Sequence, residues 1–139
     1  MAAQGFSTNA DATDNLGFVT DADLTQFNAG MENSGEFFDE SDPRYLAAAK
    51  AALMTAARNR CVLEVNTSGV YRGFRKDYFP SDELLKEWLI LSGNVVITAD
   101  AHEVKALTFG FADAAAKLKA LGYTKVQVLG KNGFTVCPL

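Results

Sequence analysis

From residue 42 to the C-terminus, the sequence alternates helix-forming stretches with short apolar runs. The three stretches with helical spacing of apolar residues are 44–58, 81–92 and 111–121, and the apolar runs are 61–66, 95–99, 126–129 and 134–137. An order of helix, strand, helix, strand, helix and strand is typical of an α/β fold with parallel strands. Right-handed crossovers bring the carboxyl ends of such strands to one edge of the sheet. We therefore expect residues 66 and 100 to lie on the same edge.

Residues that begin and end secondary structure support this assignment. Asp42 before Pro43 is typical of a helix N-cap with proline at the first helical position, and Ser81 is the expected N-cap of the second helix. Gly122 is the expected end of the third helix. Residues 131–133 predict a hairpin turn between the last two apolar runs.

Charge divides the chain into two parts. Nine of the 17 acidic residues precede Arg44, the first basic residue, which leaves eight acidic residues beside all 13 basic ones. We predict an acidic, flexible leader at residues 1–35 and a folded, mildly basic part at residues 36–139. A basic surface suits an anionic ligand such as a phosphate ester, although it also occurs in proteins without one.

Composition argues against several classes of protein. No apolar run approaches the ~20 residues of a membrane span, and no secretory signal or nucleic-acid motif is visible. We expect no membrane and no nucleic acid as partner. Cys61 and Cys137 both lie in apolar runs, which predicts buried free thiols and a reducing, cytoplasmic location.

The single histidine of the chain follows the apolar run 95–99. Asp100 and His102 are two residues apart, so in an extended chain their side chains would point to the same side. They are candidate metal ligands and catalytic residues, because ligands gather at the carboxyl ends of strands in α/β folds. The alternative is that Asp100 caps the next helix and His102 is half-buried beside it.

We predict that the segment 70–79 is a long loop, both basic and aromatic, after the carboxyl end of a predicted strand. Arg72, helped by Arg75, is a candidate phosphate-binding residue, because a guanidinium group binds phosphate oxygens through a fork of N–H donors. Asn66 is a further candidate that could donate hydrogen bonds to substrate or to the loop. The alternative for both arginines is a solvated loop charge.

Five segments in one order carry a resemblance to a known family: 63–69, 71–73, 78–81, 100–102 and 110–111. With segments 38–39 and 42–45 just upstream, they make residues 36–139 resemble the C-terminal half of histidinol-phosphatases of the polymerase-and-histidinol-phosphatase (PHP) superfamily. The short final hairpin is included, whereas residues 1–35 have no counterpart.

The resemblance implies part of a distorted (β/α) barrel with a metal centre at the carboxyl ends of its strands. Members of the family hydrolyse L-histidinol phosphate to L-histidinol and phosphate in histidine biosynthesis. They use two or three divalent metal ions, here expected to be Zn, Mn or Fe. The last metal motif of the family, Asp-x-His, is matched by Asp100 and His102.

The chain also departs from the family pattern. The family takes most of its metal ligands from an N-terminal half that begins with a His-x-His motif, and a full barrel needs about 250 residues. We therefore expect this chain to supply only part of the site, completed by the missing half or by self-association. Whether it is an enzyme alone is left open. The alternatives are another PHP phosphoesterase, or a non-catalytic remnant or binding module.

Overall fold

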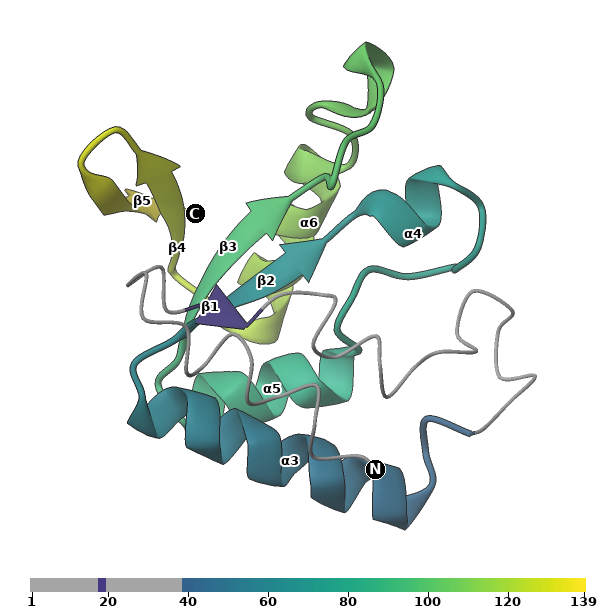
Figure 1. Ribbon diagram of the computed structural model, residues 1–139, viewed down its shortest axis with the longest axis vertical. Coiled ribbons are helices and arrows are strands. Elements are labelled where there is room, and N and C mark those ends of the chain that lie inside the picture. Colours follow the sequence, from purple (N-terminus) through teal and green to yellow (C-terminus); the bar gives the residue numbers. More distant parts are fainter. Residues whose placement is uncertain (1–17, 20–38) are drawn as a thin grey trace.

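The computed structural model describes residues 18–19 and 39–139 as an α/β fold built on one five-stranded sheet (Figure 1). The strands, in spatial order, are β1 (Phe18–Val19), β2 (Val62–Asn66), β3 (Asn94–Thr98), β4 (Lys125–Gly130) and β5 (Gly133–Pro138). The first four are parallel, and β5 pairs antiparallel with β4. The predicted α/β class and final hairpin are confirmed, and the sheet is open rather than closed into a barrel. Apart from β1, the predicted leader 1–35 lies outside the described residues.

Three long helices accompany this sheet: α3 (Pro43–Arg58), α5 (Asp82–Ile90) and α6 (Phe111–Leu121). Asp42 caps α3 as predicted, because its carboxylate accepts the backbone N–H of Arg44 at 2.8 Å. Ser81 is the N-cap residue of α5, but its side chain makes no capping bond. Gly122 ends α6 with a φ of +107°, a conformation that favours glycine. None of the helices in the described residues is long and apolar enough to cross a membrane.

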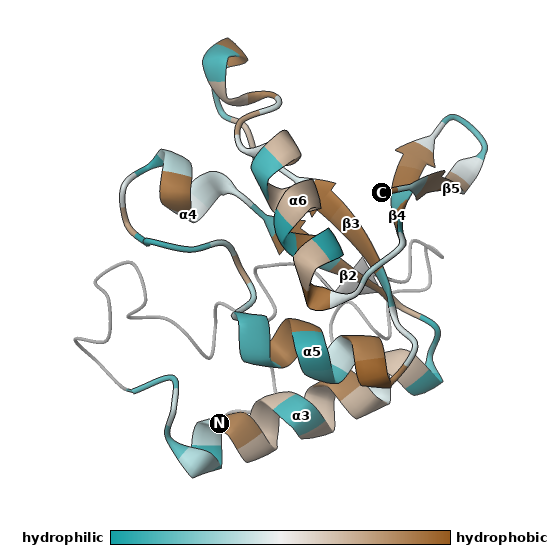
Figure 2. Ribbon diagram, turned by 180° about the vertical axis from the view of Figure 1, so that it is seen from behind, coloured by the Kyte–Doolittle hydropathy of each residue, from teal (hydrophilic) through white to brown (hydrophobic). Residues whose placement is uncertain are grey.

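One hydrophobic core joins the three helices to one face of the sheet. Its fully buried members include Leu53 of α3, Leu63 of β2, Trp88 of α5 and Leu118 of α6. Figure 2 shows β3 as a largely hydrophobic strand among helices that mix polar and apolar residues. The helical spacing of the apolar residues predicted that each helix would place some of its positions in the core and others at the surface.

Trp88 also sets the connection from α5 to β3. Its indole Nε1 donates to the carbonyl of Asn94 at 2.8 Å. A Cβ atom at Gly93 would lie only 2.1 Å from the Trp88 ring. The absence of a side chain at residue 93 therefore lets β3 start directly against the end of α5, and β3 leads to the candidate site.

Two details of the sequence interpretation are wrong. The segment 70–79 is not loop throughout, because a short helix, α4 (Ser68–Tyr71), overlaps its start. Cys61 is buried and forms no disulfide, as predicted, but Cys137 is exposed. An apolar run predicts burial of all its residues only where both faces of the strand are covered. Cys137 instead lies on β5, which is at the edge of the sheet.

Candidate functional site

The carboxyl ends of β2 and β3 lie side by side, as expected. Asn66 of β2 is in register with Thr98 of β3, and the N–H of Thr67 donates to the Thr98 carbonyl at 3.0 Å. In Figure 1 both strands point toward α4 and the segment 99–110. The segments that leave these two strands therefore form one candidate site.

Asn66 organises the exit from β2. Its buried side-chain carbonyl accepts the N–H of Ser68 at 2.8 Å, which turns the chain into α4. Its backbone pairs in both directions with Phe79, so the loop between α4 and α5 returns to the same point. These contacts make Asn66 a turn-forming residue, and its contact with substrate stays a prediction.

Asp100 and His102 are brought together by a bend rather than by an extended strand. Asp100 has a φ of +44°, a left-handed conformation that aspartate adopts more readily than most residues. The Nδ1 atom of His102 lies 2.8 Å from the Asp100 carbonyl oxygen. A carbonyl can only accept, so Nδ1 donates in this contact, and in the neutral tautomer with this proton Nε2 is the acceptor.

The alternative interpretation of this pair is wrong. The next element, the 3₁₀ helix η2 (Val104–Ala106), has Glu103 rather than Asp100 at its N-cap, and His102 is exposed rather than half-buried. Asp100 instead directs its carboxylate toward a cation on the neighbouring segment.

That cation is Arg72, at the C-terminal end of α4. Its Nη2 atom donates to Asp100 Oδ2 at 3.2 Å and to Ser68 Oγ at 3.1 Å. The guanidinium group has five N–H donors, and these two contacts use only one of its nitrogens. With its side chain 42% exposed, Arg72 can present further N–H groups to a ligand.

The two segments enclose a cavity of about 210 Å³. Its lining residues come from α4 and from the chain after β3: Ser68, Tyr71, Arg72, Ala99, Asp100, His102, Glu103 and Ala106. The structure thus brings three of the predicted residues to one cavity. Tyr71 and Glu103 were not predicted, and the only sequence signal for them is that each adjoins a predicted residue.

Tyr71 and Glu103 interact across the cavity. The Tyr71 hydroxyl donates a hydrogen bond to the Glu103 carboxylate, and this bond raises the pKa of Tyr71. The Tyr71 ring packs edge-on against Phe109 with 5.0 Å between centroids. Thr67 in turn anchors the segment that contains Phe109, because the Thr67 hydroxyl donates to the Phe109 carbonyl at 2.7 Å.

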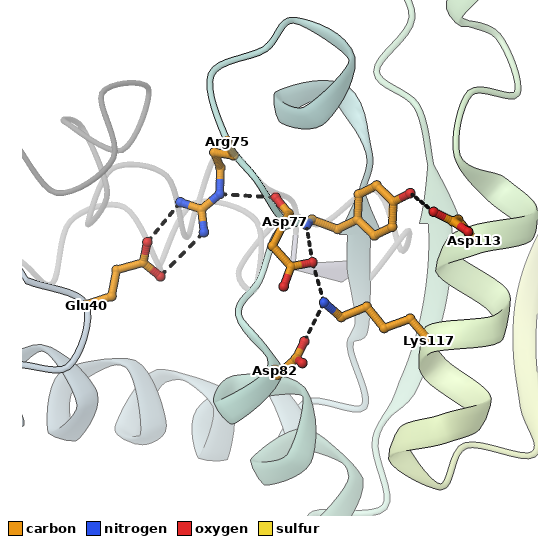
Figure 3. Close-up of polar contacts among 7 residues, drawn as sticks. Glu40, Arg75, Asp77, Asp82, Asp113 and Lys117 are labelled. Carbon is orange, nitrogen blue, oxygen red and sulfur yellow. Dashed lines mark hydrogen bonds and ion pairs between the residues drawn. The ribbon is translucent and has the colours of Figure 1, made fainter.

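Arg75 lies outside this cavity lining. It forms a bidentate contact with Glu40, at 2.9 and 3.5 Å (Figure 3). Its guanidinium group also stacks over the Phe79 ring, 4.3 Å from the ring centroid. Its side chain is only 9% exposed. In this arrangement Arg75 supports the loop, and its predicted contact with substrate stays untested.

The donors at the cavity fit part of a metal site. Asp100 offers a carboxylate and His102 offers Nε2, a pair that suits Zn, Mn or Fe. The hydrogen bond from His102 Nδ1 to the Asp100 carbonyl is of the kind that orients metal-bound histidines. However, no group of three or more metal-ligating side chains occurs among residues 39–139, and a catalytic zinc needs three protein ligands. The described residues therefore supply two candidate ligands and an incomplete site.

The fold and the cavity define an α/β protein with a site that carries charges of both signs at the carboxyl edge of parallel strands. The sequence matches no protein-family model and no curated protein. The particular family therefore remains the hypothesis that the sequence motifs raised.

Proposed function

We propose that this chain supplies the substrate-binding edge of a PHP-type phosphomonoester hydrolase that converts L-histidinol phosphate to L-histidinol and phosphate. One observation carries the proposal: Arg72, Asp100 and His102 reach a single cavity from the ends of two neighbouring parallel strands. A guanidinium beside metal-ligating groups is the combination that a phosphate ester requires. The open sheet with its helices is compatible with part of a (β/α) barrel.

Arg72 has the role of binding the phosphate. Its contact with Asp100 is a single, partly exposed ion pair, which contributes little to stability. A dianionic phosphate offers the same N–H groups a stronger, bidentate partner. Arg72 would therefore turn from Asp100 to the substrate and leave that carboxylate available.

Asp100 and His102 would hold a divalent metal ion. Such an ion supplies an activated water and neutralises phosphate charge. Because His102 is the only histidine of the chain, further histidine ligands must come from a partner, either a second copy or a separate chain with the other half of the barrel. We place the reaction in the cytoplasm, where two cysteines that form no disulfide stay reduced.

The experiment is isothermal titration of the purified chain with L-histidinol phosphate, with and without Mn²⁺. We expect binding that depends on Mn²⁺, and loss of that dependence in His102→Ala. Asn132→Ala, on the exposed β4–β5 turn, is the control and should bind as the parent does. Binding that is absent, or unaffected by Mn²⁺ and by His102→Ala, would contradict the proposal.

Phosphate release under the same conditions separates the ways of completing the site. Release that is lost in His102→Ala would show that copies of this chain complete it by self-association. Metal-dependent binding without release would mean that another chain must supply the remaining ligands, or that this chain is a binding module.

A further inference from the structure

The cavity contains one carboxylate for which the proposed phosphate and metal contacts have no use. Glu103 lines the cavity together with Arg72, Asp100 and His102. It stands directly after the Asp-x-His segment, at the N-cap of η2, and its side chain makes no capping bond there. Its carboxylate is instead directed to Tyr71 on α4.

The charges around the cavity are unequal. Arg72 pairs with Asp100, whereas the hydrogen bond that Glu103 accepts comes from the neutral hydroxyl of Tyr71. Besides the His102 imidazole, the lining presents one arginine and two carboxylates. A purely anionic ligand that binds Arg72 would leave the Glu103 carboxylate without a cationic partner in the lining. A ligand with an anionic and a cationic end would satisfy both sides.

Glu103 is held in position by one hydrogen bond, whose donor is itself supported by its neighbours. Tyr71 donates to it from α4, and the Tyr71 ring rests against Phe109. Phe109 is itself tied to the end of β2 through the Thr67 hydroxyl at 2.7 Å. A carboxylate oriented in this way is suited to bind a cation with little further ordering.

The size of the cavity limits the ligand. Its volume of about 210 Å³ is below the ~300–1,000 Å³ of sites for drug-sized ligands. Arg72 and Glu103 both line this volume, so a ligand that fills it contacts both side chains. The ligand class is therefore a compact molecule with both charges a few bonds apart.

We infer that Glu103 binds the ammonium group of the substrate whose phosphate Arg72 binds, so that the site selects phosphate monoesters of amino alcohols. Tyr71 is a positioning residue that orients the Glu103 carboxylate. L-Histidinol phosphate belongs to this class, because its amine stands on the carbon next to the one that bears the ester. The inference rests on the proposed function and adds to it a residue that determines specificity.

The test compares L-histidinol phosphate with its deamino analogue, 3-(imidazol-4-yl)propyl phosphate, by titration calorimetry in the presence of Mn²⁺. We expect the parent chain to bind the amine-bearing ligand about 10-fold or more tightly than the analogue, because hydrogen bonds between charged groups are strong. Glu103→Gln should abolish this preference and leave affinity for the analogue unchanged. Retained affinity for the analogue also shows that the variant is folded.

Two further variants complete the comparison. Tyr71→Phe should reduce the preference without abolishing it, because the carboxylate loses only its orientation. Glu83→Gln removes a carboxylate that pairs with Lys50 on the helix layer, and it should leave both affinities unchanged.

The outcomes separate the inference from the proposed function. Equal binding of both ligands by the parent chain, or a preference that survives Glu103→Gln, would overturn the role of Glu103 alone. Equal weakening of both ligands by Glu103→Gln would also overturn it, since that result indicates a structural or metal-binding role. Failure of the parent chain to bind either ligand would overturn the proposed function and the inference together.

Discussion

Arg72 pairs with Asp100 and is proposed to bind the substrate as well. Replacing Arg72 should therefore change the affinities for substrate and for metal in opposite directions. Arg72→Ala should weaken binding of L-histidinol phosphate by about 10- to 100-fold, because hydrogen bonds to a charged group are lost. The same change should tighten binding of Mn²⁺ alone, because Asp100 loses the cation that competes for its carboxylate at 3.2 Å. Titration calorimetry with each ligand separately measures both effects.

Arg58→Ala is the matched control, because Arg58 is an exposed arginine at the end of α3, in the helix layer. It should change neither affinity. Arg72→Ala with unaltered affinity for the phosphate ester would remove Arg72 from the site, whatever happens to the metal.

Among the elements, α3 depends on a cap that titrates. The hydrogen bonds from the Arg44 side chain and backbone lower the pKa of Asp42 from 3.8 to about 2. A carboxyl group with a lowered folded-state pKa stabilises the fold above its unfolded pKa, and this stabilisation is lost as the pH falls through the folded value. Asp42→Ala should therefore lower the melting temperature near neutral pH, with the difference from the parent shrinking between about pH 4 and pH 2.

Asp42→Asn is the informative partner of this variant. Asparagine keeps an oxygen that can accept the Arg44 N–H but loses the charge, so its melting temperature should lie between those of the parent and Asp42→Ala. Thermal unfolding followed by circular dichroism at several pH values measures all three. A difference between parent and Asp42→Ala that stays constant down to pH 2 would rule out the titrating cap.

Across the whole fold, a polar network joins the loop that follows α4 to α5, to α6 and to the turn before α3 (Figure 3). Lys117 of α6 pairs with Asp77 of the loop and, at 2.7 Å, with Asp82 in the first turn of α5. Arg75 of the same loop pairs with Glu40, which precedes α3. The position of Arg72 thus depends on contacts between parts of the chain that are far apart in sequence.

Replacing Lys117 by methionine tests this dependence. Partial burial lowers the pKa of Lys117, but the hydrogen bonds with Asp77 and Asp82 outweigh it and raise the pKa overall. Lys117→Met keeps the packing of the side-chain stem and should cost about 1 kcal/mol of unfolding free energy, because both carboxylates are about half exposed. The stabilisation is present below the unfolded pKa of lysine and is lost as the pH rises through the higher folded value.

Urea unfolding measures this loss, and hydrogen exchange should show faster exchange in residues 72–81. Lys119→Met is the control on the same helix, because Lys119 contacts only the chain end, at the carbonyl of Leu139, among the polar partners described. Equal effects of the two variants would contradict a specific role for the network.

Features of this protein that depend on neighbouring residues could be predicted from the sequence. The cap at Asp42, the end of α6 at Gly122 and the turn of the final hairpin follow from backbone preferences that act over a few residues. The common edge of β2 and β3 followed from the alternation of helices and strands, since crossovers have one hand. The same rules correctly predicted that Asp100 and His102 follow the carboxyl end of a strand.

Which side chains meet at the site became clear only from the folded arrangement. Arg72 and Arg75 are three residues apart in one segment of the sequence. In the structure, however, Arg72 pairs with Asp100 and Arg75 pairs with Glu40. The pairing of Tyr71 with Glu103 joins residues 32 positions apart, which no local pattern encodes. The physical reason is that burial and pairing of a side chain depend on segments distant in sequence, whereas helices, turns and strands are selected by the backbone preferences of adjacent residues.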